Sequence, residues 1–264
     1  MATFLLDLDG TMYHGNRIIP SAKEFLDYLQ KSGQEYYFLT NNASRTPQEN
    51  ALHMEKIGYQ NIEARRFYNS AMACVSYAQK RVIGHRVMMI GQSGLADELY
   101  KAGYQLVEEG ADMVMVGLNQ EGNYRLYSQA LQNLLQGAIL LGTNEDRVLL
   151  SESGTKLGNG SIVKMLEYAS GQTAICTGKP AAVFLEEALD YWGLDKEEVV
   201  MVGDNLETDI LCGLNAKVTT VLVLGGVSNR NDCERLTIQP DHIVATLPNL
   251  ANFHTNFHNL NTLI

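Results

Sequence analysis

Short apolar runs alternate with longer amphipathic stretches along the whole chain. The apolar runs are continuous, as is typical of strands in a sheet that is buried on both faces. The stretches between them space apolar residues three and four positions apart, which indicates helices with one buried face. The pattern predicts an α/β fold with a mainly parallel sheet between helices. The expected strands lie at 4–6, 36–39, 87–90, 113–116, 139–141, 199–202 and 218–224, and the expected helices include 93–103, 123–135, 157–170, 181–192 and 206–214.

Capping signals predict where the first two helices begin and end. Ser21, followed three residues later by Glu24, is typical of a capping box, and Gly33 stands where a helix commonly ends. A second helix is expected to begin with Pro47 as its first residue and to end before Gly58.

Composition narrows the class of protein. The 264 residues are 45% hydrophobic and 19% charged, which is enough for one large domain or two smaller ones. The net charge of −10 argues against nucleic acid as a partner. Four widely spaced cysteines form no zinc motif and indicate reduced thiols in a cytoplasmic protein. The sequence shows neither a signal peptide nor an apolar run that could cross a bilayer, so no membrane partner is expected.

Two carboxylates follow the first expected strand. Asp7 and Asp9 stand two residues apart, so on an extended chain they point the same way, and Gly10 then allows a sharp turn. Open α/β sheets bind ligands at the carboxyl ends of their strands. Two such carboxylates repel each other unless a cation or a proton lies between them. The pair is therefore more typical of a cation site than of a solvated strand end.

Three further polar motifs also follow expected strands. Thr40-Asn41-Asn42 offers a hydroxyl and backbone N–H groups that can hold an anionic oxygen. Lys179 offers a point charge for a phosphoryl group and precedes an expected helix with Pro180 as its first residue. Asp204 ends a buried run, and Asp209 lies about one turn into the next helix. Taken singly, Thr40-Asn41-Asn42 is more typical of a polar turn, and Gly178-Lys179-Pro180 indicates nothing by itself. Asp204 and Asp209 are more typical of a functional site than of a helix N-cap.

The combination decides between these interpretations. One parallel sheet would bring the carboxyl ends of these strands to the same edge, where three carboxylates, a lysine and a hydroxyl converge. This set is suited to Mg²⁺-assisted phosphoryl transfer, in which positioning and charge neutralisation supply most of the catalysis.

In order and type the motifs resemble the haloacid dehalogenase superfamily, and most closely its NagD-like, 4-nitrophenylphosphatase-type branch. The resemblance rests on Asp7-Leu8-Asp9-Gly10-Thr11-Met12, Thr40-Asn41-Asn42-Ala43-Ser44, Thr177-Gly178-Lys179-Pro180 and Gly203-Asp204-Asn205-Leu206-Glu207-Thr208-Asp209-Ile210. It implies a Rossmann-like three-layer core into which a large α/β cap domain is inserted. The long interval between Thr40 and Lys179, which holds further expected strands, agrees with such an insertion. We expect the core to comprise 1–81 and 178–264, and the cap to comprise 82–177.

The resemblance implies a role for each motif residue. Asp7 is the expected nucleophile and Asp9 the expected general acid and base. Thr40, Asn41 and Lys179 are expected to hold the phosphate. Mg²⁺ is expected on the carboxylates of Asp7 and Asp204 and the main-chain carbonyl of Asp9. Asn205 and Asp209 are expected to support these groups, Asp209 through Lys179 or a metal-bound water.

The predicted cap contributes candidates for specificity. Thr143-Asn144-Glu145-Asp146 resembles a motif of the same branch, although another residue usually stands at the position of Glu145. Asn144, Glu145 and Asp146 follow an expected cap strand, and acidic groups there would disfavour leaving groups that carry extra negative charge. An ordinary polar turn is an equally good interpretation of this segment.

The expected activity is Mg²⁺-dependent hydrolysis of a small phosphorylated metabolite, such as a sugar phosphate or a nucleoside monophosphate, through an aspartyl-phosphate. A phosphotransferase or phosphomutase would use the same motifs and differ only in the acceptor. A phosphate-binding regulator would need neither Asp7 nor Asp9 for chemistry, and a receiver-like signalling domain has no use for a large cap. The resemblance also leaves open a homodimer formed through the cap.

Overall fold

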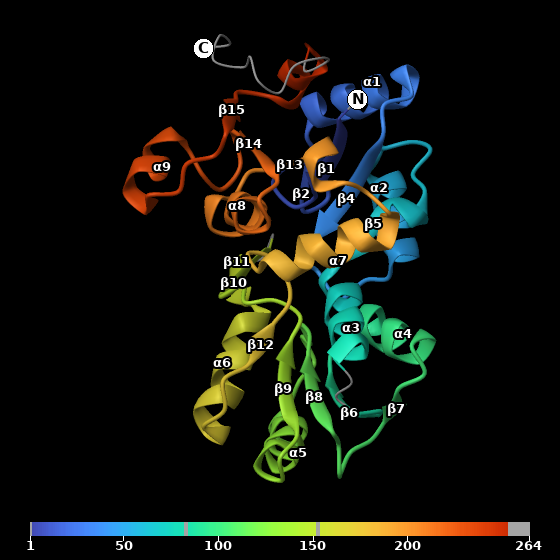
Figure 1. The fold of residues 1–264 in the computed structure, drawn as a ribbon, viewed down its shortest axis with the longest axis vertical. Helices are drawn as coiled ribbons and strands as arrows, with labels where there is room; N and C mark the ends of the chain where they lie inside the picture. Colours follow the sequence, from blue (N-terminus) through green and yellow to red (C-terminus); the bar gives the residue numbers. More distant parts are fainter. Residues whose placement is uncertain (1, 82–83, 152–153, 253–264) are drawn as a thin grey trace.

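The computed structural model describes residues 2–81, 84–151 and 154–252, and these form two parallel sheets, each flanked by helices (Figure 1). The larger one, the core sheet, has six strands in the order β15-β14-β13-β1-β4-β5, and all of its neighbouring strands run parallel. Its strands are β1 (Thr3–Asp7), β4 (Tyr36–Thr40), β5 (Phe67–Asn69), β13 (Val199–Gly203), β14 (Thr219–Val223) and β15 (His242–Val244).

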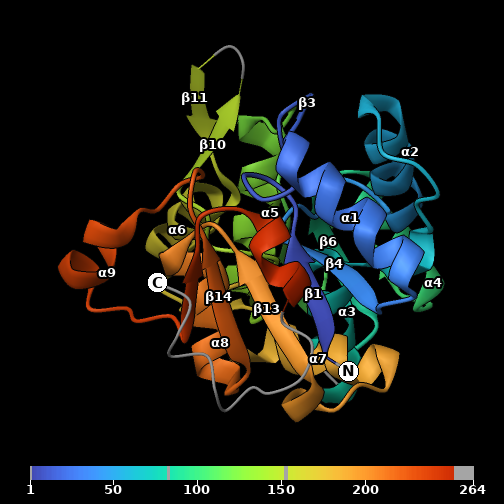
Figure 2. The ribbon, with the colours of Figure 1, turned by 90° about the horizontal axis from the view of Figure 1, so that it is seen from above.

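Helices cover both faces of the core sheet, so the predicted three-layer α/β arrangement is confirmed (Figure 2). Alternate strand residues face opposite ways: Leu6 packs under α1 and α2, whereas Leu5 packs under α7 and α8. The helical elements of this part are α1 (Pro20–Ser32), α2 (Pro47–Ile57), η1 (Ala64–Arg66), α7 (Ala182–Trp192), η2 (Lys196–Glu198), η3 (Leu206–Ile210), α8 (Leu211–Ala216), α9 (Arg230–Leu236) and η4 (Leu247–Asn252).

The helix ends confirm most capping predictions and correct two. Thr46 caps α2 with a full capping box, and Gly33 and Gly58 end α1 and α2 in the left-handed conformation. The prediction of a capping box at Ser21 is wrong, because Pro20 already starts α1 and Ile19 is the N-cap residue. The prediction that Pro180 opens the next helix is also wrong, since α7 begins at Ala182.

The second sheet, the cap sheet, has five parallel strands in the order β12-β9-β8-β6-β7. Helices α3 and α4 cover one face of it, and α5 and α6 cover the other. Two antiparallel hairpins accompany the sheets, β2–β3 and β10–β11. These elements are β2 (Tyr13–His14), β3 (Arg17–Ile18), α3 (Ser70–Arg81), β6 (Arg86–Ile90), α4 (Ser93–Lys101), β7 (Gln105–Leu106), β8 (Met113–Val116), α5 (Tyr124–Leu135), β9 (Ile139–Gly142), β10 (Val148–Ser151), β11 (Gly154–Leu157), α6 (Asn159–Ser170) and β12 (Ile175–Cys176).

Helix α3 belongs to the packing of both sheets. Its residue Ala73 packs with α7 on the core sheet, and its residues Cys74, Val75 and Ala78 pack on the cap sheet. Side-chain contacts to α7 reinforce the first interface, with Ser76 donating to Glu187 at 2.6 Å. A cut at residue 82 would therefore expose the face of α3 that covers the cap sheet.

The two sheets face each other across the loop 41–46, which follows β4. The end of β8 at Gly117 lies against Ala43, and Gly94, after β6, donates its N–H to the carbonyl of Ser44 at 3.2 Å. The end of β9 at Thr143 packs against Gly178. We call these two edges, where the parallel strands end, the core rim and the cap rim.

Among the residues that the structure describes, no helix is both long and apolar enough to span a membrane.

Candidate active site

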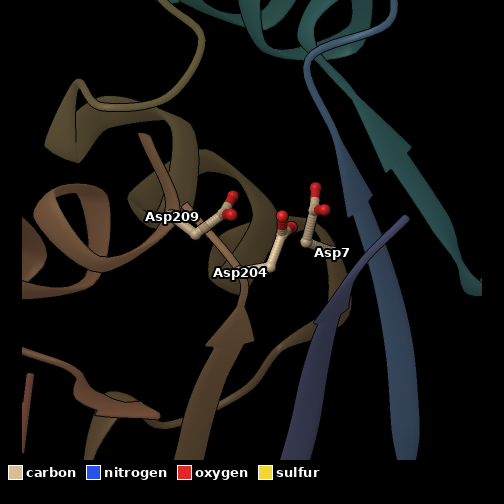
Figure 3. Close-up of side chains that lie close together, drawn as sticks. All are labelled: Asp7, Asp204 and Asp209. Atoms are coloured by element: carbon tan, nitrogen blue, oxygen red, sulfur yellow. The ribbon is translucent and has the colours of Figure 1, made fainter. Parts of the chain in front are cut away.

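Three buried carboxylates meet at the core rim (Figure 3). Asp7 is the last residue of β1, Asp204 directly follows the neighbouring strand β13, and Asp209 lies in the π-helical turn η3. One oxygen from each of the three lies within 4.8 Å of the others. Carboxylate oxygens gathered in this way are suited to a hard divalent cation.

The backbone around Asp204 leaves no room for larger residues. Its carboxylate accepts from the Thr11 hydroxyl at 3.0 Å and from the Val227 N–H at 2.7 Å. Gly10 has a φ of 97°, and a Cβ there would lie 2.3 Å from Asp204 Oδ2. A Cβ at Gly226 would lie 2.0 Å from the same oxygen. Both glycines are therefore required for this carboxylate to reach the rim.

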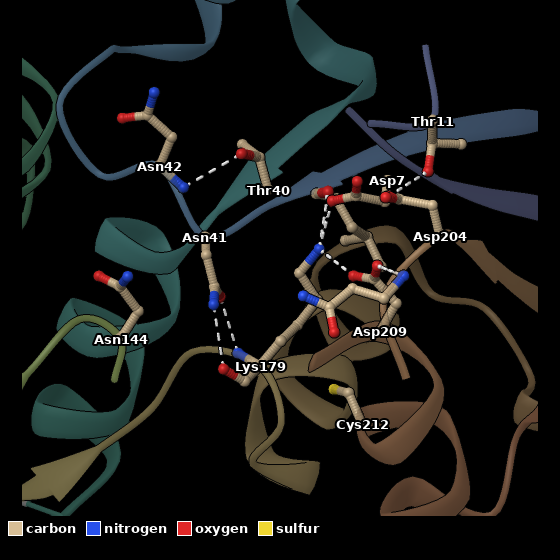
Figure 4. Close-up of polar contacts among 12 residues, drawn as sticks. Asp7, Thr11, Thr40, Asn41, Asn42, Asn144, Lys179, Asp204, Asp209 and Cys212 are labelled. Atoms are coloured by element: carbon tan, nitrogen blue, oxygen red, sulfur yellow. Dashed lines mark hydrogen bonds and ion pairs between the residues drawn. The ribbon is translucent and has the colours of Figure 1, made fainter. Parts of the chain in front are cut away.

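Lys179 inserts its ammonium between two of these acids (Figure 4). Its Nζ lies 2.5 Å from Asp7 Oδ1 and 2.6 Å from Asp209 Oδ1, and its side chain is only 2% exposed. Burial alone would lower the pKa of Lys179, but the charges of Asp209 and Asp7 outweigh it and raise the pKa. The two carboxylates therefore favour the charged form of the buried lysine.

One lysine does not neutralise three carboxylates. Burial, and after it the charge of Asp209, raises the pKa of Asp7 well above its usual range. The same two causes raise the pKa of Asp204 to about 6. Ionised oxygens so close together repel each other in a medium of low dielectric, and a divalent cation would relieve that repulsion. The three acids therefore fit a divalent metal ion in both donor chemistry and charge.

Asp9 lies just beyond β1, where it is exposed at the rim. The surrounding protein nevertheless keeps part of the water away from its carboxyl group and so raises its pKa, against the opposing charges of Arg45 and Lys179. A carboxyl group that faces solvent and has a raised pKa gives up its proton less readily than a free aspartate does, which suits a general acid. Arg45 is a residue that the sequence interpretation missed. It stands three residues beyond Thr40-Asn41-Asn42 in the same loop, which is the signal that could have indicated it.

The two predicted phosphate-binding residues after β4 differ in their contacts. The buried Thr40 hydroxyl accepts from the Asn42 N–H at 3.1 Å. The Asn41 side chain turns toward Lys179: its Nδ2 donates to the Lys179 carbonyl at 3.0 Å, and its Oδ1 accepts from the Lys179 N–H at 2.8 Å (Figure 4). The structure thus brings Thr40, Asn41 and Lys179 to the rim that carries the acids. The expectation that one sheet carries all of these motifs is wrong for Lys179, because the strand before it, β12, pairs with β9 in the cap sheet.

Asn205 and Asp209 organise the turn after β13. Asn205 caps η3 by accepting from the Glu207 N–H at 3.0 Å, and its own N–H donates to Asp209 Oδ2 at 3.2 Å. A Cβ at Gly203 would lie 2.3 Å from Asp209 Cβ, so this close approach depends on glycine. Asp209 therefore reaches Lys179 with its other oxygen fixed to the backbone.

The three candidate specificity residues of the cap make different contacts in the structure. Asn144 is buried, and its Nδ2 donates to Asp146 Oδ2 at 2.6 Å. Asp146 approaches the core, where both of its oxygens lie 3.3 Å from Asn41 Nδ2. Glu145 is 47% exposed and lies 3.6 Å from Lys164 on α6. Asn144 and Asp146 therefore contact each other and the core rim, whereas Glu145 contacts α6.

Comparisons with known proteins agree with this geometry. Residues 4–105 match the family of haloacid dehalogenase-like hydrolases, and residues 176–250 match a HAD-hydrolase-like family. An acid sugar phosphatase of Staphylococcus aureus is 36% identical over 242 residues, which cover 90% of this chain and 92% of that protein.

Solved structures of phosphatases are similar over nearly the whole chain. NagD from E. coli K-12 has a TM-score of 0.86 at 32% identity, covering 94% of this chain and 97% of its own. A 4-nitrophenylphosphatase from Thermotoga maritima has a TM-score of 0.88 at 28% identity, covering 95% and 96%.

The chain belongs to the haloacid dehalogenase-like hydrolases. Within that family it is a NagD-like enzyme, a phosphatase that hydrolyses phosphoric monoesters. Phosphatases of this family generally use a divalent metal, which agrees with the buried cluster of Asp7, Asp204 and Asp209.

Proposed function

We propose that this phosphatase hydrolyses small phosphorylated metabolites, sugar phosphates foremost, with Mg²⁺ and through an aspartyl-phosphate on Asp7. The observation that carries the proposal is the buried group of three carboxylates in contact with the Lys179 ammonium. The sugar-phosphate class is supported by the Staphylococcus aureus relative, which is named an acid sugar phosphatase.

In the first step a carboxylate oxygen of Asp7 attacks phosphorus as the bond from phosphorus to the ester oxygen breaks. Asp9 supplies the proton that the departing alkoxide takes up. Lys179, together with the Thr40 hydroxyl and the Asn41 N–H, is assigned to the phosphoryl oxygens, whose charge it offsets. The product of this step is the free alcohol, with the phosphoryl group on Asp7.

In the second step the Asp9 carboxylate takes a proton from water, and the water oxygen attacks phosphorus. The bond from phosphorus to Asp7 breaks, which releases inorganic phosphate and restores the Asp7 carboxylate. Mg²⁺ would be held by Asp7, Asp204 and the main-chain carbonyl of Asp9, and it would supply neutralising charge for the phosphoryl group. Asp209 would hold Lys179 in place throughout.

We assign residues 82–177 to the cap that closes over this rim. The cap rim faces the core rim across the loop 41–46, so a bound substrate would have its leaving group on the side of the cap. Exclusion of water from the closed rim would strengthen the charge interactions there.

A panel of phosphorylated metabolites tests the proposal. We expect turnover to require Mg²⁺: it should vanish with a chelator and return when Mg²⁺ is added again. Sugar phosphates should be among the fastest substrates. Hydrolysis that continues unchanged in chelator would overturn the metal assignment. A panel in which sugar phosphates are inert while other metabolites turn over would overturn the substrate class.

A further inference from the structure

The main chain of Lys179 is held by one side-chain amide. Asn41 accepts from the Lys179 N–H at 2.8 Å and donates to the Lys179 carbonyl at 3.0 Å (Figure 4). Two hydrogen bonds to one planar amide fix the backbone on both sides of the Lys179 Cα. The direction in which the lysine side chain leaves the backbone, toward Asp7 and Asp209, is fixed with it.

The Asn41 amide is in turn held from the cap. Its Nδ2 lies 3.3 Å from both carboxylate oxygens of Asp146, while its Oδ1 accepts from Lys179. Asp146 can only accept hydrogen bonds when it is ionised, so it requires the NH₂ group of Asn41 on its side. Asp146 thereby selects the amide orientation that Lys179 needs.

Asp146 is anchored within the cap by a chain of buried polar groups. Asn144 donates to Asp146 Oδ2 at 2.6 Å, and the Thr143 hydroxyl donates to Asn144 Oδ1 at 2.9 Å. From helix α6, Asn159 Nδ2 reaches Thr143 Oγ1 at 3.3 Å and the Val116 carbonyl at 3.0 Å. Polar contacts therefore run without interruption from the cap sheet to the backbone of Lys179.

The residue before Lys179 adds an independent contact with the same cap loop. A Cβ at Gly178 would lie 2.4 Å from the Thr143 carbonyl and 2.7 Å from Asn41 Oδ1. The cap loop and the Asn41 amide thus both pack closely against the residue before Lys179. The position of this segment depends on the cap as well as on the core.

We propose that Asp146 is a positioning residue for Lys179, acting through the amide of Asn41, rather than a residue that selects the leaving group. The inference rests on the proposed function, in which Lys179 offsets phosphoryl charge. It makes the cap part of the machinery that aligns the lysine. Loss of Asp146 should therefore impair all phosphomonoesters alike.

The charge of Asp146 by itself predicts that its removal improves the site, whereas the proposal predicts that its removal impairs catalysis. The two predictions can therefore be told apart. Asp146 is an acid near a cationic phosphate site, so its removal would strengthen anion binding if only electrostatics mattered. If it positions Lys179, its removal weakens catalysis. Asp146→Asn separates the two effects, because it loses the charge but keeps an oxygen that can accept from Asn41.

The experiment compares Asp146→Ala and Asp146→Asn on 4-nitrophenyl phosphate and on several sugar phosphates, all with Mg²⁺. We expect Asp146→Ala to lower kcat roughly tenfold on every substrate with little change in KM, because a displaced catalytic group costs rate. Asp146→Asn should recover most of that loss. Asn144→Ala, which removes the donor to Asp146, should lower kcat by a smaller and equally uniform factor.

Ser93→Ala is the matched control. Ser93 also joins cap to core, through the Ser44 carbonyl at 3.1 Å and the Glu49 carboxylate at 3.1 Å. Within the described part of the chain its side chain makes no hydrogen bond to Asn41, Asp146 or Lys179, so kcat should stay at the wild-type value. Three results would overturn the proposal: a changed substrate ranking in Asp146→Ala, tighter binding of inorganic phosphate without loss of kcat, or an equal loss in Ser93→Ala. If Asp146→Ala does not fold, Asp146→Asn and Asn144→Ala decide: wild-type kcat in Asn144→Ala, or a changed ranking in either, counts against the proposal. Failure of the wild-type enzyme to require Mg²⁺ would instead count against the proposed function.

Discussion

The core sheet and the cap sheet share one architecture but carry different chemistry. Both are wholly parallel and covered by helices on both faces, and their rims face each other. The core strands and the turns that follow them carry the three buried acids of the core rim, whereas β6, β8 and β9 of the cap are followed directly by Gly91, Gly117 and Thr143. The buried lysine that reaches the core rim, Lys179, comes from the segment after cap strand β12. Parallel topology therefore creates a place for chemistry at the ends of both sheets, and the residues after each strand decide what that strand contributes: acids from the core strands and one lysine after a cap strand.

The small residues where cap and core meet have a packing role that larger side chains would prevent. A Cβ at Gly94 would lie 2.5 Å from the Ala43 carbonyl, and one at Gly178 would lie 2.4 Å from the Thr143 carbonyl. Small residues let the cap approach the loop 41–46 this closely. Asp146 is the exception, since it places a carboxylate of the cap against the core.

The largest expected effect comes from removing the chemistry of the core rim at Asp7. Asparagine has no carboxylate oxygen with which to form the phosphoryl-enzyme, so Asp7→Asn should lose roughly 10⁴-fold or more in kcat on 4-nitrophenyl phosphate. The variant and the wild type are compared at equal metal occupancy. Activity within about tenfold of the wild type, a difference of only ~1.4 kcal/mol, would remove Asp7 from the role of nucleophile.

Asp9→Asn should separate binding from proton transfer on the same rim. Its carbonyl stays available to the metal while its acid and base functions are lost, so kcat should fall about 10²- to 10⁴-fold with substrate binding retained. Nitrophenolate needs no proton to leave, so a pre-steady-state burst of this product is expected. A raised KM with unchanged kcat would instead make Asp9 a binding residue.

Binding of Mg²⁺ should stabilise the core rim in a way that depends on Asp204. At roughly a hundred times its Kd, the ion should raise the free energy of unfolding by about 2.7 kcal/mol, and Asp204→Asn should lose most of this gain. Denaturant unfolding with and without Mg²⁺ measures it.

Asp112→Asn provides the control on the cap. This half-buried carboxylate accepts from the backbone N–H groups of His85 and Arg86 at 2.9 and 2.8 Å. Its loss should lower stability and leave the gain from Mg²⁺ intact. Equal gains in wild type and Asp204→Asn would place the metal elsewhere.

The smallest effect is expected on selectivity, when a short linker replaces residues 82–177. Removal of the cap exposes the apolar face of α3 that packs on the cap sheet. The variant therefore also carries Val75→Ser and Ala78→Ser, which make that face polar. Mg²⁺ binding should remain, while the ratio of kcat/KM between the best and worst substrates should shrink by about tenfold. A core that keeps the wild-type ranking on the metabolite panel would place selectivity in the core.

Local patterns predicted the elements best where one face or both faces of an element are evenly apolar. The strands at 4–6, 113–116 and 199–202 were expected and are present. Helix α3 was not expected, because it packs against two sheets and its sequence, rich in small residues, lacks a single apolar stripe. The two-stranded hairpin β10–β11 also lay outside the expected elements.

The expected site residues came together for a reason that the sequence already contains. Asp7, Thr40 and Asp204 each stand at the end of a strand or directly after one, and parallel strands end at one edge of their sheet. The strand pattern, together with the rule that parallel strands end at one edge of their sheet, is enough to predict that these three residues lie close together. Their proposed roles in catalysis remain predictions.

The sequence by itself determined the α/β class, the alternation of strands and helices and the polar residues of the core rim, because each depends on neighbours a few positions apart. Only the tertiary structure decided that the cap rim faces the core rim, and that Asp146 holds Asn41 while Glu145 lies against α6. Asn41 and Lys179 are 138 residues apart in the chain, and Asn41 and Asp146 are 105 apart. No local pattern encodes such contacts, since they follow from how two sheets pack against each other.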